Sequence, residues 1–294
     1  MAEEAVTRSL GKVFLHRGIY FVEGLTTPEE IDSLENFSVR DTDVFLITFP
    51  KSGTVWIQQI LSLIYHKGHL NKTENIKTEV RIPWIEYNIK KVDFERLPSP
   101  RLWTTHLPHY LAPKDLKKKK AKIIYVTRNP KDNMISSYYF AKTILSVTKN
   151  KDWFSSLLDL VSGEKLLGGF WFDHVKGWHS HKDDYNILFL QYEDMVKDLR
   201  SAVLKICNFV GKDLDDQTVD AIVERATFKN MKSDPLANYA HIGQQHRKTQ
   251  KKSNFLRKGT IGDWKNVMTV AQNEKFDKIF GEKLKDLPIK FIWD

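Results

Sequence analysis

The stretch "FPKSGTVW", Phe49 to Trp56, joins a strand-like run to a helical pattern. The run that leads into it, "VFLITF" from Val44 to Phe49, is nearly all apolar, which is typical of a parallel strand buried on both faces. After it, apolar residues recur at helical spacing: Trp56, Ile57, Ile60, Leu61 and Ile64. The sequence therefore predicts a strand, a short loop and a helix.

The loop has the residue types of a phosphate site. Gly53 permits close approach of the backbone, Ser52 and Thr54 supply hydroxyl groups, and Lys51 supplies a positive charge next to the helix N-terminus. A kinase or GTPase loop places its lysine directly before the helix, with a hydroxyl beside it for magnesium, whereas here Lys51 precedes the glycine. We therefore expect a phosphate without a metal ion. The alternative is a capped helix with a solvated lysine.

Two further runs predict strands of the same kind: "KIIYVT" from Lys122 to Thr127, and "NILFLQY" from Asn186 to Tyr192. A helix is expected to begin near Lys131 and to run through Tyr139. The chain shows no internal repeat, linker or break in composition. We therefore expect one α/β domain over residues 1–294, with a central parallel sheet flanked by helices and a phosphate-binding strand-loop-helix.

Ligands of parallel α/β sheets bind at the carboxyl ends of the strands. Arg128 leaves the second strand and Ser136 lies on the helix that follows, a combination suited to a second phosphate. A surface ion pair and an ordinary helix serine would explain the same two residues. The polar, basic stretch 233–259 ends in "RKG" at Arg257 to Gly259, and so long an irregular stretch is typical of a covering or binding loop. Together these clusters suggest a ligand such as an adenosine 3′,5′-bisphosphate.

The composition indicates a basic protein of a reducing compartment. The net charge of +9 favours acidic partners without choosing among nucleic acid, an anionic membrane and a small polyanion. The single cysteine, Cys207, excludes an internal disulfide, and it lies on the packed face of a helix predicted from the cap Asp198 to Gly211. That face is expected to carry Leu199, Val203, Leu204, Cys207 and Val210.

The N-terminus has no signal-peptide pattern, and residues 1–15 are expected to be partly disordered. No stretch approaches the ~18 apolar residues of a membrane span, so we expect a cytoplasmic protein with no membrane partner. The lysine run from Lys117 to Lys120 is interpreted as a solvated turn, and no nucleic-acid partner is predicted.

Four motifs carry a family resemblance: "TFPKSGTVW", "RNPKDNMISSYY", "FLRKGTIGDWK" and "TVAQNEKFD". Together they resemble the cytosolic sulfotransferases, and the similarity covers nearly the whole chain. Within that family, "ENFSVRDTDVFLITFPKSGT", "LSLIYHKGHLNKTENI" and the ending "LPIKFIWD" are most similar to the amine sulfotransferase branch.

The resemblance implies a donor, 3′-phosphoadenosine-5′-phosphosulfate (PAPS), with adenosine 3′,5′-bisphosphate as product and no metal. Lys51 would be a catalytic residue, because a lysine beside the bridging oxygen stabilises the charge that develops as the sulfuryl group leaves. Trp56 and Tyr192 would offer flat faces to the purine. The resemblance assigns these residues to the PAPS site: Lys51, Ser52, Gly53, Thr54, Val55, Trp56, Arg128, Ser136, Tyr192, Ala226, Thr227, Phe228, Lys229, Asn230, Met231, Arg257, Lys258 and Gly259.

The resemblance also implies that His106, in "LWTTHLP", is the catalytic base. A histidine suits this task because its unperturbed pKa lies near the working pH. The implied acceptor pocket contains Trp84, Tyr87, Thr104, Thr105 and His106. Trp84 and Tyr87 could equally be ordinary core residues, and Glu86 either a partner for a cationic nitrogen or one half of a structural ion pair.

Three positions depart from the family pattern. Thr104 stands where most members have a lysine, although the amine-type enzymes also carry a small hydroxyl residue there. Ala226 replaces a hydroxyl residue at the adenine contact, and Phe49 replaces a tyrosine of the loop. We expect the changes at Ala226 and Phe49 not to abolish donor binding. With Thr104, one cation near the transferring sulfuryl group and the acceptor is missing.

We expect transfer to a small amine, giving a sulfamate. O-sulfation of phenols, steroids or other hydroxyl compounds is the alternative within the family, and a nucleotide-dependent kinase or a nucleic-acid-binding module is the alternative outside it. A kinase needs a metal ligand after its loop, where Val55 and Trp56 stand instead. An RNA-binding module needs exposed aromatic residues on its sheet, whereas these strands are expected to be buried.

The segment "KNVMTVAQNE", Lys265 to Glu274, matches the short dimer signature of the family. A homodimer is therefore implied through Lys265, Thr269, Val270 and Glu274. Thr269 and Gln272 also have the spacing of a capping box, which explains the threonine without a partner. Both interpretations predict a helix after Thr269, packed through Phe276, Ile279 and Phe280.

Overall fold

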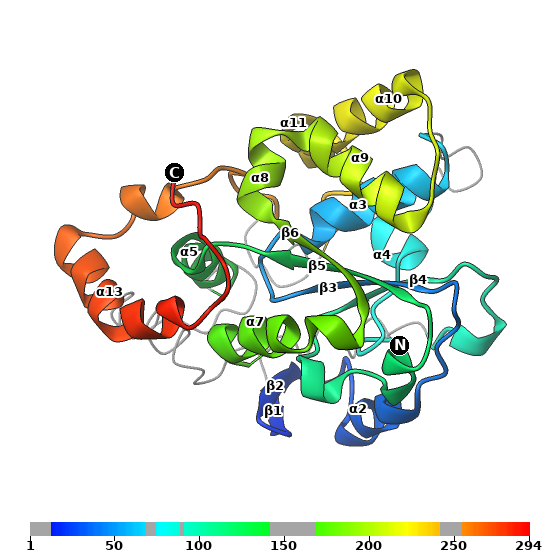
Figure 1. Ribbon diagram of the computed structural model, residues 1–294, viewed down its shortest axis with the longest axis horizontal. Coiled ribbons are helices and arrows are strands. Elements are labelled where there is room, and N and C mark those ends of the chain that lie inside the picture. The colour runs from blue at the N-terminus through cyan, green and yellow to red at the C-terminus, as the bar shows by residue number, and fades with distance from the viewer. Residues whose placement is uncertain (1–12, 69–74, 89–90, 142–168, 242–254) are drawn as a thin grey trace.

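The computed structural model describes residues 13–68, 75–88, 91–141, 169–241 and 255–294. A parallel sheet of four strands forms its centre, in the order β4-β3-β5-β6 (Figure 1). The strands are β3 (Val44–Thr48), β4 (Leu102–Thr105), β5 (Lys122–Thr127) and β6 (Asn186–Gln191). The predicted α/β fold with a central parallel sheet is therefore confirmed, and β4 is the strand that the sequence pattern did not predict.

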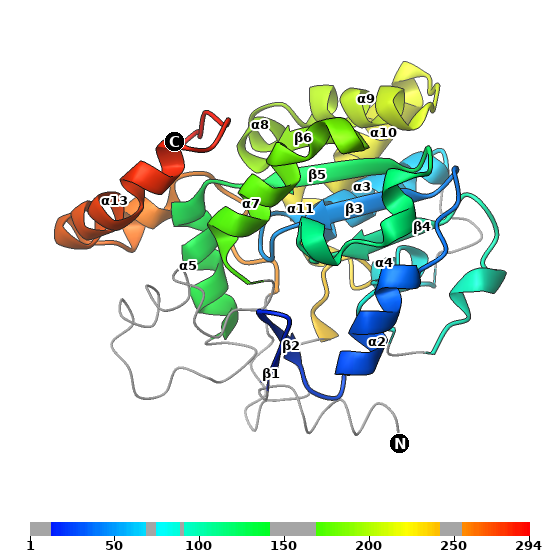
Figure 2. The same cartoon turned by 60° about the horizontal axis from the view of Figure 1, so that its bottom comes forward.

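Helices cover both faces of the sheet (Figures 1 and 2). On one face lie α3 (Thr54–Tyr65), α4 (Thr78–Arg81), α8 (Tyr192–Lys197), α9 (Leu199–Val210), α10 (Asp216–Ala226) and α11 (Phe228–Ser233). On the other lie α2 (Pro28–Ser33), α7 (Trp171–Ser180) and a hairpin of β1 (Val13–His16) and β2 (Ile19–Val22). At one side, α5 (Pro130–Phe140) lies between the sheet and α13 (Val270–Lys285). Short 3₁₀ turns are Leu34–Asn36, Phe94–Arg96, His109–Leu111, Lys114–Lys117, Lys182–Asp184 and Asp263–Asn266.

Side-chain alternation in β3 divides the core into two layers. Val44 and Leu46 pack with α3, α9 and α10, whereas Phe45 and Ile47 pack with Trp178 of α7 on the other face. Both sets are almost completely buried. This burial on both faces explains why the strand is apolar throughout rather than alternating.

Helix α9 begins and ends at the residues that the sequence analysis identified as its caps. The Asp198 side chain accepts a hydrogen bond from the Ser201 N–H at the start of α9, and Gly211 ends the helix in the left-handed conformation. Cys207 is buried, as expected. The predicted packed face is wrong at Leu204, which is exposed. Ile206, which was not predicted to pack, is buried instead.

The capping box of Thr269 and Gln272 is present at the start of α13. Phe276 and Phe280 are buried as predicted, whereas Ile279 is exposed, so the packed face of this helix is narrower than expected. No helix in the described part of the chain is both long and apolar enough to cross a membrane.

Two predicted segments lie partly outside the described residues. Of the stretch 1–15, residues 1–12 are not described and the rest begins β1. Of the covering loop 233–259, residues 242–254 are not described. In its described part Ala237 and Tyr239 are buried, and the Tyr239 hydroxyl donates to Gln58 Oε1 of α3 at 2.7 Å. This end of the segment is therefore packed on the domain.

The strand order reverses between β3 and β5, since the chain moves from β3 outward to β4 and then returns to the other side of β3. At such a point the loops that leave the two strands diverge and open a crevice at the carboxyl edge. The loop after β3 contains Lys51, and Arg128 directly follows β5. The fold therefore places the two predicted phosphate-binding clusters on either side of the crevice.

Candidate active site

The loop after β3 has an unusual backbone. Lys51 and Gly53 both have positive φ, 68° and 101°, and α3 begins at Thr54. A Cβ atom on Gly53 would lie 2.8 Å from the Tyr192 ring, so only glycine fits there. The turn therefore brings backbone N–H groups, the start of α3 and the Lys51 side chain together, as a phosphate site requires.

The Lys51 ammonium lies between two aromatic rings, 4.4 Å from the Phe140 centroid and 4.1 Å from that of Phe255. Burial, together with the positive charges of Arg128 and Arg257, lowers the pKa of Lys51 to about 7. Three cationic side chains thus lie close enough for two of them to act on the third, and a bound anion would favour the protonated lysine.

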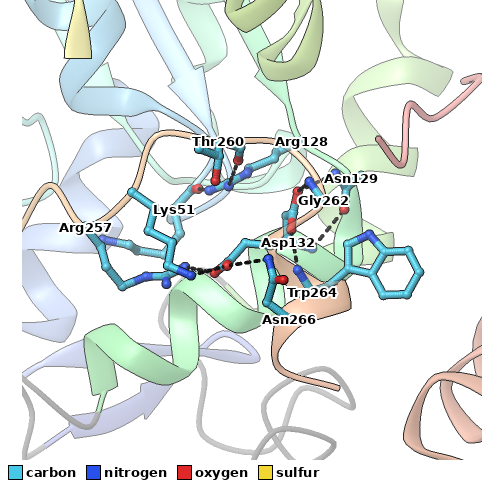
Figure 3. Close-up of polar contacts among 11 residues, drawn as sticks. Lys51, Arg128, Asn129, Asp132, Arg257, Thr260, Gly262, Trp264 and Asn266 are labelled. Atoms are coloured by element: carbon cyan, nitrogen blue, oxygen red, sulfur yellow. Dashed lines mark hydrogen bonds and ion pairs between the residues drawn. The ribbon is translucent and has the colours of Figure 1, made fainter. Parts of the chain in front are cut away.

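Arg128 connects the two sides of the crevice. Its guanidinium donates to the carbonyls of Lys51 and Thr260, each at 3.3 Å, and lies 4.3 Å from the Tyr192 ring centroid (Figure 3). The side chain is buried, and its Nε has no hydrogen-bond partner among the described residues. Within the same part of the chain no carboxylate forms an ion pair with it, so the alternative of a surface ion pair does not hold.

Helix α5 holds the loop after β3 through a residue that the sequence analysis missed. The Asn133 amide donates to the carbonyl of Pro50 at 2.9 Å and to Ser52 Oγ at 3.0 Å. Ser136 lies further along the same helix and is partly exposed. The motif "RNPKDN" therefore supplies both Arg128 and a support for the loop that contains Lys51.

The third basic cluster lies across the crevice. The Arg257 guanidinium donates to Asp263 at 2.6 Å, and the Lys258 ammonium bonds the other oxygen of that carboxylate (Figure 3). Gly259 has a positive φ of 69°, and a Cβ atom there would overlap the Phe228 ring. The predicted cluster is therefore packed directly against α11, the segment that was predicted to contact the nucleoside.

The predicted nucleoside contacts come together around Trp56. Its indole N–H donates to the Ala226 carbonyl at 2.7 Å, and its ring meets the Tyr192 ring edge-on with centroids 5.5 Å apart. Thr227 caps α11 by accepting from the Asn230 N–H. The structure places the remaining residues predicted for this pocket in the same turn or helix: Phe228, Lys229 and Met231. Val55 lies beside it in the first turn of α3 and packs against Met231.

His106 follows β4, and its ring orientation is fixed by a carbonyl. The Thr48 carbonyl lies 2.6 Å from Nδ1, and because a carbonyl can only accept, Nδ1 carries the proton. The Nε2 atom is then left with its lone pair. Burial lowers the pKa of His106 to about 4, so the ring is neutral at physiological pH and able to accept a proton.

Two residues that the sequence analysis did not select as positioning groups hold the His106 backbone. Glu86 Oε1 accepts from the His106 N–H at 2.7 Å, and the His174 Nε2 donates to the His106 carbonyl at 3.2 Å. Burial raises the pKa of Glu86 to about 7. Among the described residues Glu86 forms no ion pair, so the structural ion pair considered for it is absent.

The residues predicted for the acceptor pocket differ in how close they lie to His106. The Trp84 ring lies 4.6 Å from the His106 ring and 6.3 Å from that of Tyr87. Thr105 Oγ1 accepts from the Leu107 N–H. Thr104 is fully buried, and its hydroxyl accepts from Gln58 Nε2 at 2.8 Å. Trp84 thus lies directly beside His106 with Tyr87 next to it, whereas the Thr104 hydroxyl is bonded to α3.

Two histidines and an aspartate form the one group of possible metal ligands found among the described residues. His109, His181 and Asp184 bring possible ligand atoms within 4.8 Å of one another. The two imidazole rings are stacked nearly parallel, with centroids 3.5 Å apart, so their lone pairs do not converge. Asp184 is also paired with Lys117 at 2.8 Å. We assign no metal to this cluster.

Comparisons with known proteins agree with this geometry. Residues 41–288 match the family profile of the sulfotransferase domain. The chain is 53% identical over 283 residues to the amine sulfotransferase of Oryctolagus cuniculus, covering 95% of this chain and 92% of that protein. It is 38% identical over 279 residues to the 3-alpha-hydroxysteroid sulfotransferase of Cavia porcellus, covering 94% and 96%.

A solved structure gives the same result at the level of the fold. The crystal structure of mouse sulfotransferase SULT7A1 complexed with PAP superposes with a TM-score of 0.77 at 33% identity, covering 93% of this chain and 94% of that one. The family match spans most of the chain and both relatives are similar over nearly their whole length. The chain belongs to the sulfotransferase family.

Proposed function

We propose that the protein transfers a sulfuryl group from PAPS to the nitrogen of a small amine. The observation that carries this proposal is the neutral His106, protonated on Nδ1, at the same sheet edge as Lys51 and Arg128, which have no carboxylate partner among the described residues. The likeness to the rabbit amine sulfotransferase supports the amine acceptor. The likeness to the mouse sulfotransferase complexed with PAP supports the donor.

The residues present fit such a nucleotide. Arg128 has a buried Nε without a partner, and Lys51 has a depressed pKa that an anion would restore. Gly53 lies against the Tyr192 ring and Gly259 against the Phe228 ring, so close that no Cβ atom fits. Glycine at these positions lets both backbone turns pack directly on the rings. Trp56 is only partly buried, so part of its ring could contact a base.

PAPS would supply the sulfuryl group that is transferred. Lys51 would hold its ammonium beside the oxygen that leaves with the 5′-phosphate, where negative charge grows as the sulfur–oxygen bond breaks. His106 Nε2 would accept the proton that the amine loses as the nitrogen–sulfur bond forms. Glu86 and His174 would keep the imidazole in place from both sides of its backbone.

Arg257 and Lys258 would hold the 3′-phosphate together with Arg128, and Trp56 and Tyr192 would flank the purine. Trp84 and Tyr87 would form an apolar wall for the acceptor next to the base. Because Thr104 replaces the second lysine of most family members, Lys51 would be the main cation at the reacting centre.

The test is a comparison of kcat/KM for an alkylamine, an arylamine, a simple phenol and a hydroxysteroid at a fixed PAPS concentration. We expect both amines to exceed the two hydroxyl acceptors. A preference for the phenol or the steroid would keep the sulfotransferase activity and discard the amine assignment.

Turnover of an alkylamine is expected to rise with pH. Only the neutral amine has a lone pair for attack, and an alkylamine with a pKa of ~10 is almost fully protonated near neutrality. His106 does not limit this rise, because its pKa of about 4 leaves it unprotonated throughout. Lys51 does not limit it either, because bound PAPS is expected to raise the lysine pKa from about 7 and keep the ammonium protonated. With saturating PAPS, kcat/KM should therefore increase by up to about tenfold per pH unit between about pH 6 and 9.

An arylamine is the matched control, since its nitrogen is already unprotonated at the lower end of this range. Its profile should be much flatter in the same buffers. Equal slopes for the two acceptors would indicate that an enzyme group, rather than the amine, sets the pH dependence.

We also propose a homodimer through the start of α13. Val270 is 75% exposed there, next to the capping residue Thr269, with Glu274 one turn further on. Lys265 lies before the helix and pairs with Asp294 at 2.6 Å. A short surface segment of this kind can pair with its own copy across a two-fold axis.

Val270→Glu is expected to convert the dimer into a monomer, because two copies of the carboxylate would face each other across the axis. Sedimentation velocity measures the change. Ile279→Glu alters an exposed apolar residue of the same helix outside the motif and should leave the dimer intact. An unchanged dimer for Val270→Glu would remove this segment from the interface.

A further inference from the structure

A buried carboxylate in the first turn of α5 holds the loop that follows the third basic cluster. Asp132 is 1% exposed, and its two oxygens accept from the backbone N–H groups of Gly262 at 2.8 Å and Trp264 at 3.0 Å (Figure 3). These two donors flank Asp263 in the sequence. Asp132 therefore fixes the backbone on both sides of the Asp263 side chain.

Asp263 connects this loop to the cations of the cluster. It is nearly inaccessible and bonds the Arg257 guanidinium through one oxygen and the Lys258 ammonium through the other. Burial alone would raise the pKa of Asp263, but the bonds from Lys258 and Arg257 outweigh it and leave the pKa lowered. The carboxylate thus holds both cations in one place.

Asn129, which follows β5, holds Asp132 in place and is itself bonded to Glu193, which follows β6. The Asn129 amide donates to Asp132 at 3.0 Å and also to Glu193 at 2.9 Å, and Asn129 Oδ1 accepts from the Asp132 N–H at 2.8 Å. Asn129 follows β5, and Glu193 follows β6 by two residues. In the described part of the chain Asp132 makes no ion pair, so its contacts are directional bonds rather than charge neutralisation.

We propose that Asp132 is a positioning residue for the 3′-phosphate of the donor nucleotide. It acts through the backbone of Gly262 and Trp264 and through Asp263, which together set the positions of Arg257 and Lys258. This inference rests on the proposed function, and it adds a residue that makes no contact with the nucleotide but confers selectivity for a 3′-phosphate.

Two adjacent residues of α5 bond different loops, one at each of the two proposed phosphate sites. Asn133, the next residue, bonds Pro50 and Ser52 in the loop that contains Lys51. Among the described residues, the Asp132 carboxylate bonds the opposite loop and Asn129. Loss of the Asp132 charge should therefore disturb the 3′-phosphate site and leave the 5′-phosphate site in place.

The test compares adenosine 3′,5′-bisphosphate with adenosine 5′-phosphate by calorimetric titration of the full chain. The unmodified protein should bind the bisphosphate more tightly. In Asp132→Asn one oxygen becomes an amide that cannot accept, and the affinity for the bisphosphate should fall on the order of 10- to 100-fold. The affinity for the monophosphate should change less than about threefold.

Asp215→Asn is the matched control. Asp215 is also a carboxylate that accepts from a backbone N–H, Thr218 N at 2.7 Å, but it caps the start of α10, far from Asp132 in the sequence. Its substitution should alter neither affinity. Because both nucleotides are titrated into one preparation, a misfolded fraction lowers the number of binding sites and not the ratio of affinities.

Asn129→Ser is a second variant. We expect a smaller loss of affinity for the bisphosphate, because Asp132 keeps its bonds to Gly262 and Trp264. Equal losses for both nucleotides in Asp132→Asn, or no loss, would overturn the positioning role. An unmodified protein that binds the two nucleotides equally would instead contradict the proposed donor.

Discussion

His106→Ala is expected to lower kcat for amine sulfation by about 10²- to 10⁴-fold, the usual contribution of a general base. The Thr48 carbonyl accepts a hydrogen bond from the Nδ1–H of His106, so Nε2 is the ring atom that can accept the proton of the amine. Alanine leaves no other acceptor at that position. Binding of adenosine 3′,5′-bisphosphate should stay within about threefold, because the histidine belongs to the acceptor side.

Steady-state kinetics of both proteins with the same alkylamine give the ratio of kcat. His66→Ala is the control, since His66 bonds the Ser62 carbonyl of its own helix and lies outside the site. A His106→Ala protein that keeps more than about a tenth of the activity would show that another group or solvent accepts the proton. In that case the free Nε2 would have no catalytic meaning.

Lys51→Met is expected to reduce kcat by about 10²- to 10³-fold, the cost typical of losing one preorganised group at a developing charge. The side chain lies between Phe140 and Phe255, so methionine can occupy the same space without the charge. Thr104 offers no cation in compensation. The KM for PAPS should also rise, because the ammonium attracts the phosphosulfate before the reaction as well.

Single-turnover measurements separate the two effects, since they report the chemical step at saturating PAPS. Lys114→Met, which removes a surface lysine paired with Glu35, should leave both constants unchanged. A Lys51→Met protein with a raised KM and an unchanged single-turnover rate would make Lys51 a binding residue and not a catalytic one.

The parallel sheet could be predicted because three of its strands are mostly apolar. β4 could not, since its sequence "LWTT" is short and half polar. Its threonines are buried by pairing with β3 and by the bond from Gln58 to Thr104, contacts between residues far apart in the sequence. Leu204 and Ile279 were assigned to packed faces because spacing marks a stripe but not its width.

The loops at the carboxyl ends of the strands could also be predicted, because the parallel order forces them to one edge of the sheet. The contact between Arg128 and the Lys51 carbonyl bears this out. The supporting residues could not be found in this way. Glu86 and His174 reach His106 across 20 and 68 positions, and Asp132 reaches Trp264 across 132. No local pattern predicts pairs so distant.

The most direct test of amine sulfation uses an acceptor that carries both an alkylamine and a phenol, such as tyramine, with radiolabelled PAPS near pH 9. The sulfamate and the aryl sulfate are isomers of equal mass, so the product is identified by NMR against the two authentic standards. Our account predicts the sulfamate as the main product, formed by the unmodified protein and nearly absent with His106→Ala. A product that carries the sulfate on the phenolic oxygen, or no transfer at all, would contradict it.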